Sequence, residues 1–139
     1  MTIEEAVCAR LLATSAVTAL VGQRVYPDQA PDLGPDQTQF PRVVYSQADR
    51  KTVMTHSGPV ALNSYAMDLT VDALTKTSAK ATAKAVGDSL KGYRGTQSGL
   101  VVLGIFDTTE GDGFEPPQHA GERGTFSVTL SVNVWFRQP

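Results

Sequence analysis

The sequence predicts an α+β fold in which helices pack on one face of a mixed, mainly antiparallel β-sheet. In residues 125–136 apolar side chains alternate with small polar ones, with Trp135 as the exception. Because successive side chains of a strand point to opposite faces, this period of two indicates a long strand with one buried face. Residues 65–73 show the same alternation. Residues 79–90 instead carry apolar side chains three and four positions apart, which is typical of an amphipathic helix.

The N-terminal segment predicts two helices followed by a loop. Thr2 and Glu5 can form a capping box at the start of the first helix. Ser15 can cap a second, short helix that ends at Gly22, a residue suited to the left-handed conformation of a helix terminus. Residues 27–41 contain four prolines, which interrupt helices and central strands, so we expect an exposed loop there.

The remaining strands are predicted from short apolar runs. Residues 42–47 favour a strand, and a polar connection over residues 47–59 leads to the strand at 65–73. After the helix, residues 100–106 predict a short strand and residues 107–124 a long connection. A strand, helix, strand crossover is usually parallel, whereas neighbouring strands joined by loops pair antiparallel, so a mixed sheet is expected.

Size and composition limit the classes of protein. The 139 residues predict one domain over residues 1–139 that buries roughly two thirds of its unfolded surface. The net charge of −2 disfavours sequence-independent DNA binding, which needs a basic excess. We expect cytoplasmic synthesis, since the first residues lack a signal-peptide pattern, and no membrane span, since no apolar run approaches about 20 residues.

The sequence indicates no catalytic or metal site. Cys8 lies among apolar positions of the first helix, where a thiol behaves as a small, inert hydrophobe, and it has no second cysteine to pair with. His56 and Ser57 lack a positioned base and an oxyanion hole. The only other histidine is His119, so zinc would need distant ligands, and the acidic residues of 107–124 do not follow an EF-hand order. We therefore expect no enzymatic activity, no cofactor and no metal.

Charge is unevenly distributed along the chain. Lys76, Lys80 and Lys84 form a basic stripe on the predicted helix, whereas residues 107–122 are acidic. Solvated surfaces are the ordinary explanation. The alternative is that the two segments meet between copies, in a head-to-tail contact that can close into a ring.

Several segments of the chain, by their order and spacing, resemble the segments of a known protein family. They are GQRVYP at 22–27, PRVVY at 41–45, a Gly58-Pro59 connection into a strand ending VDA at 71–73, an alanine-rich helix ending at Leu90, and VWF at 134–136. Together they resemble the tail completion, or tail terminator, family of long-tailed bacteriophages, nearly from end to end.

The resemblance implies a structural virion protein, made in the cytoplasm of the bacterial host. It implies a ring, expected to be hexameric, at the head-proximal end of the tail tube, where it ends tube polymerisation and joins the tail to the head connector. The implied partners are further copies of the chain, the tail tube protein and the head connector or neck protein. Genomic DNA would pass through the lumen without sequence-specific binding, and no membrane is involved.

The predicted loops are the natural carriers of such contacts, because connections that project from a rigid sheet can order on a partner. Phe40 and Phe114 are aromatic residues in polar loops and would anchor an interface, unless each folds back onto its own core. The expected interface residues are Phe40, Arg50, Lys51, Lys80, Lys84, Asp107, Glu110, Asp112, Phe114 and Glu115.

Three alternatives remain open at this point. A head completion or neck protein of the same virion is the nearest, and the sequence does not separate it from a terminator. A cytosolic enzyme could use His56, Asp68 or Asp72, but these have no obvious converging partner. A nucleic-acid-binding module would depend on the basic helix and would bind in a strongly salt-dependent way, which the net charge disfavours.

Overall fold

The computed structural model describes residues 3–28, 40–55, 58–97, 100–116 and 124–137. The elements, in chain order, are α1 (Ile3–Ala13), α2 (Ser15–Val21), β1 (Val25–Pro27), β2 (Arg42–Thr55), β3 (Gly58–Ala73), α3 (Lys76–Leu90), β4 (Gly95–Gln97), β5 (Leu100–Glu115) and β6 (Thr125–Arg137). Thr2 and residues 29–39, in which most of the predicted proline-rich loop falls, lie outside the described residues.

The six strands form one sheet in the order β1-β2-β3-β6-β5-β4. Among the described strands, only β1 and β2 are parallel, and the other neighbouring pairs are antiparallel. The chain passes from β3 through α3 and the short β4 to β5. Strands β3 and β5 run in the same direction, with β6 inserted between them. The prediction of a mixed, mainly antiparallel sheet is therefore confirmed.

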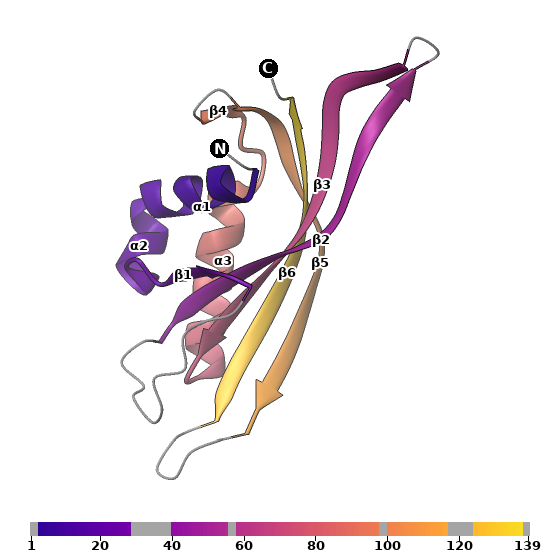
Figure 1. Cartoon of the computed structure of the whole chain (residues 1–139). Coiled ribbons are helices and arrows are strands. Elements are labelled where there is room, and N and C mark those ends of the chain that lie inside the picture. Colours follow the sequence, from indigo (N-terminus) through magenta and orange to yellow (C-terminus); the bar gives the residue numbers. More distant parts are fainter. Residues whose placement is uncertain (1–2, 29–39, 56–57, 98–99, 117–123, 138–139) are drawn as a thin grey trace.

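All three helices cover the same face of the sheet, and the opposite face is open (Figure 1). Helix α3 packs on β3, β5 and β6, while α1 and α2 pack on α3. Alternate side chains of the central strands point into this layer, so the polar residues between them lie on the open face. Large side chains that are fully buried in the core include Leu11, Met67, Leu69, Leu90, Ile105 and Phe136.

Local hydrogen bonds define how α3 begins and how α1 joins the core. Thr75 caps α3 by accepting a hydrogen bond from the Ser78 amide at 3.1 Å, so the helix begins at Lys76. At the other end, Gly92 adopts a φ of +72°, which glycine allows, and its amide donates to the Ile105 carbonyl at 3.1 Å. On α1, Glu4 accepts a hydrogen bond from the Tyr65 hydroxyl and so ties the helix to β3.

Two predicted connections are in fact strand. Residues 47–59 were expected to form a polar connection, but β2 continues to Thr55 and β3 begins at Gly58. Residues 107–124 were expected to form a long connection, but β5 continues to Glu115, paired with β6 throughout. Both segments lack a clear hydrophobic alternation, and cross-strand pairing with a patterned neighbour is what makes them strands. The sheet therefore has two long hairpins, β2–β3 and β5–β6.

We predict that Phe136→Ala lowers the free energy of unfolding by about 3–5 kcal/mol, because it leaves a cavity at a fully buried position. The matched control on the same strand is Asn133→Ala, at a half-buried position on the open face, which should change stability by no more than about 0.5 kcal/mol. Urea unfolding followed by circular dichroism measures both. Equal effects of the two substitutions would contradict the assignment of the faces.

Candidate interaction surface

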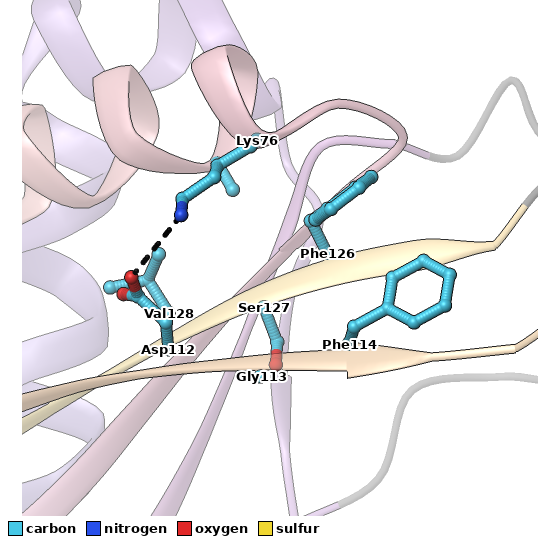
Figure 2. A pocket seen from close by; sticks show the side chains of 8 residues that line it. Lys76, Asp112, Gly113, Phe114, Phe126, Ser127 and Val128 are labelled. Atoms are coloured by element: carbon cyan, nitrogen blue, oxygen red, sulfur yellow. Dashed lines mark ion pairs between the residues drawn. The ribbon is translucent and has the colours of Figure 1, made fainter.

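Helix α3 and strand β5 bring the basic and acidic residues of the chain together. The Lys80 Nζ lies 2.7 Å from Asp112 Oδ1 and 3.9 Å from Glu110 Oε1. Lys76 Nζ lies 4.0 Å from Asp112 Oδ2, as Figure 2 shows. In the sheet register Asp112 is opposite Val128, whose side chain is buried beneath the helices, so the carboxylate points toward α3.

These contacts form within one chain. The sequence suggested the same charges for a contact between copies, but the extension of β5 to Glu115 places Glu110 and Asp112 beneath α3 of their own subunit. The hydrogen bond from Lys80 holds the pKa of Asp112 below its ordinary value and raises the pKa of Lys80. The pairs are partly exposed, so they orient β5 against α3 more than they stabilise the fold.

Lys84 has a different partner from Lys80, although both lie on the same helix. Its Nζ is 2.8 Å from Asp88 Oδ2, one helical turn further along α3. This hydrogen bond raises the pKa of Lys84. Lys84 is therefore not part of the contact with β5, although the sequence grouped the two lysines.

Phe114 lies at the end of β5, beside a cavity of about 250 Å³ between α3, β5 and β6. Its ring packs on Phe126, with centroids 4.9 Å apart and planes tilted by 53°, yet 59% of the residue remains exposed (Figure 2). Any side chain at Gly124 would collide with the Phe114 ring, so the glycine makes room for it. Phe114 is thus supported on one side by its own chain and open on the other. The cavity is lined by Lys76, Ala79, Asp112, Gly113, Phe114, Phe126, Ser127 and Val128.

Phe40 lies apart from this cluster, two residues before the start of β2. The Arg42 guanidinium is stacked 4.6 Å from the centre of the Phe40 ring and also pairs with Asp72 at 3.3 Å. Burial raises the pKa of Asp72, and Arg42 opposes this effect. Phe40 therefore contacts its own chain through Arg42.

The residues considered as catalytic candidates either form hydrogen bonds or ion pairs within the sheet or lie outside the described part of the chain. Asp72 pairs with Arg42, and Asp68 accepts a hydrogen bond from Ser131 at 2.8 Å. His56 is not among the described residues. Cys8 is half-buried, and burial raises the pKa of its thiol, which lowers its reactivity. Within the described part of the chain, no group of histidine, cysteine and acidic residues is arranged to hold a metal ion.

The other expected interface residues are placed by the backbone alone. Arg50 and Lys51 lie in β2, opposite Tyr65 and Ser64 of β3. Asp107 lies in β5, next to an irregularity in its pairing with β6, and Glu115 is the last residue of β5. The side chains of Arg50, Lys51 and Asp107 are outside the described part.

The structure thus brings together Lys80, Glu110, Asp112 and Phe114, but not Phe40 or Lys84. It adds Lys76 and Phe126 to the cluster. In the sequence, the four-residue spacing between Lys76 and Lys80 could have indicated that Lys76 belongs to this cluster. Phe126 looked only like a core residue of the last strand.

By fold, the chain is a small α+β protein with one sheet, helices on one face and two long hairpins. Its sequence gives the family: residues 5–137 match the family described as Tail completion protein gp17, and the chain belongs to this family. It is a structural component of a phage-type virion tail.

A solved structure has the same fold. A chain of the "Virion of native gene transfer agent (GTA) particle" superposes with a TM-score of 0.63 at 23% sequence identity, over 94% of this chain and 91% of that chain. Among curated proteins, none matches. In the described residues, no helix has the length and apolar character needed to cross a bilayer.

We predict that Asp112 titrates at a lower pH than an unpaired aspartate. Lys80→Met should raise its pKa, whereas Lys84→Met removes a lysine of the same helix that pairs with Asp88 and should leave it unchanged. The measurement is an NMR titration of the side-chain carboxyl carbons. The pair's contribution to stability is present above the unfolded pKa of aspartate and is lost as the pH falls through the lower folded pKa. An unaltered Asp112 pKa in Lys80→Met would show that the pair does not form in solution.

Proposed function

We propose that this protein forms a ring, expected to be hexameric, at the head-proximal end of the tail tube. There it ends tube polymerisation and joins the tail to the head connector. The observation that carries the proposal is the family match over residues 5–137. The fold shared with a chain of a gene transfer agent virion supports it.

The shape of the subunit suits three kinds of contact. A ring subunit at the end of a tube needs a neighbour on each side, the tube protein at one end and the connector at the other. The β2–β3 and β5–β6 hairpins project from opposite ends of the sheet (Figure 1). Each hairpin would therefore reach a different axial partner, while the edges of the sheet face the neighbouring copies.

The charge of the chain is compatible with a channel for DNA. Strong binding to phosphates would hinder transit, and the net charge of −2 gives no general attraction to DNA. We propose that genomic DNA passes the ring without sequence-specific recognition. The protein would be made in the bacterial cytoplasm and incorporated at the head-proximal end of the tail.

We predict that deleting the gene from its parent genome gives tail tubes of irregular and extended length that do not attach to heads. The reason is that tube subunits continue to add when no ring covers the growing end. Electron microscopy of lysates measures the distribution of tube lengths. Complementation with the intact gene is the control and should restore a single length.

The same experiment distinguishes the head completion or neck alternative. Loss of a neck protein would leave tubes of normal, uniform length beside unjoined heads. That outcome would overturn the terminator assignment while keeping the protein in the virion.

We predict that Phe114→Ala leaves folding intact but impairs assembly. Phe114 is largely exposed and packs mainly on Phe126 and beside Gly124, so its truncation should cost about 1 kcal/mol or less. Phe126→Ala is the contrast, because Phe126 packs against the core and its loss should cost roughly 2 kcal/mol. Thermal unfolding gives the stabilities, and light scattering with and without tail tubes gives the assembly. Normal assembly by Phe114→Ala would remove Phe114 from the interface.

A further inference from the structure

The two outer long strands of the sheet have edges that are only partly covered. Strand β4 pairs with β5 at residues 100–102, and β1 pairs with β2 at residues 43–45. At Ile105 the edge of β5 is also covered, because the carbonyl accepts a hydrogen bond from the Gly92 amide. Beyond these contacts, no described strand lies along the outer side of β5 from 106 to 114 or of β2 from 46 to 55. An uncovered edge presents unpaired amides and carbonyls, which are a template for pairing with another strand.

The free part of β5 has some of the devices that protect edges, namely acidic residues and an irregularity in its pairing, but it lacks others. It contains no proline and no lysine, and it is longer than a typical whole strand. Its pairing with β6 is irregular between Asp107 and Thr109, and a second irregularity of β5 lies between Val102 and Gly104. Phe106, in the same stretch, is 57% exposed. Such an edge is expected to be covered in the working assembly.

The strand directions allow the two free edges to pair with each other between copies. Neighbouring long strands alternate in direction across β2, β3, β6 and β5, so β2 and β5 are antiparallel. A rotation about a ring axis that runs along the strands preserves these directions. The β2 strand of the next copy would therefore meet β5 as an antiparallel neighbour, like the other long pairs.

The free edges of β2 and β5 also overlap along the direction of the strands. Through the register of β3 and β6, Ser46 lies level with Thr109, and Asp49 lies level with Phe106. Residues 46–49 of β2 and 106–109 of β5 thus lie at the same level on opposite edges of the sheet. A shift along the strands, as tilted strands in a closed sheet require, lengthens this overlap.

The charges of the two edges are complementary. Residues 106–114 of β5 include Asp107, Glu110 and Asp112 and no basic residue. The free part of β2 holds Asp49, Arg50 and Lys51, which sum to +1. Lys76 and Lys80 neutralise part of the acidic charge within the subunit. The remaining difference in sign favours a β5 edge meeting a β2 edge over two like edges meeting.

We propose that the β5 edge of one copy pairs with the β2 edge of the next, so that the ring is built on one continuous antiparallel sheet. The contact is heterologous, and repeating it by rotation closes a ring. This inference rests on the proposed function, because it specifies the surface through which the ring forms.

Disulfide trapping tests the pairing. In a Cys8→Ala background, cysteine replaces Thr109 or Gly111 on β5 together with Ser46, Asp49 or Lys51 on β2, all of which belong to the open face by register. Thr109 is exposed, and a Cβ at Gly111 meets nothing within 4 Å. Directly opposed residues on one face have Cβ atoms close enough for a disulfide when the register matches. Each single-cysteine variant is a matched control.

Light scattering first shows whether the ring forms from the protein alone or only in the presence of tail tubes. Oxidation is then carried out under the condition in which the ring is present. At least one double variant should give a ladder of covalent oligomers on a non-reducing gel, ending at the ring size, while single variants stay monomeric. A ring without any ladder overturns the edge pairing and leaves the proposed function standing. Dimers of Thr109→Cys alone also overturn it, since they indicate two like edges meeting. Absence of a ring in both states overturns the proposed function as well.

Hydrogen exchange of the unsubstituted protein gives a second readout that does not depend on the variants. The outward-facing amides within residues 106–114 and 46–55 should exchange at least about tenfold more slowly in the ring than in the monomer, whereas the alternate amides are already bonded to β6 or β3. Residues of β3 and β6, which are already paired on both sides, serve as the internal control. Unchanged exchange along both edges would contradict the proposal.

Discussion

The contact between the apolar face of α3 and the central strands β3 and β6 is the interaction on which the rest of the structure depends. The buried positions of α3 include Ala79 and Ala83, whose small side chains let the helix lie close to the sheet. Because α1 and α2 pack on the same side, only one face of the sheet is buried. The open face can therefore consist of short polar side chains, and both long hairpins can extend beyond the helices.

The sequence predicts those parts of the fold in which burial imposes a period. Strand β6 and helix α3 were located correctly because one side of each must be apolar. The outer halves of the hairpins were missed because residues 48–55 and 107–115 show no such period, and their strand structure comes from pairing with β3 and β6. Long-range pairing of this kind leaves little trace in the sequence of the strand that is being paired.

The candidate surface was predicted less well than the fold, for the same reason. Treating residues 107–124 as a loop left Glu110 and Asp112 without a fixed direction, so their pairing with Lys80 of the same chain could not be foreseen. Lys80 and Lys84 looked equivalent, and only the position of β5 separates them. Phe114 was singled out as an interface anchor because it is an aromatic residue in a polar stretch; that role stays a prediction, and the residue is 59% exposed. The family resemblance did not depend on any of these details, because it came from the order of segments along nearly the whole chain.

Strand β6 comes last among the described strands, yet it lies in the middle of the sheet, between β3 and β5. Until it is in place, the two strands that flank it have no common partner, and α3 lacks part of the surface on which it packs. Most of the contacts that complete the core are therefore distant in sequence, which slows folding relative to a fold with local contacts. Synthesis must pass residue 137 before the subunit can close its sheet, so an unfinished chain cannot present both outer edges in their final positions.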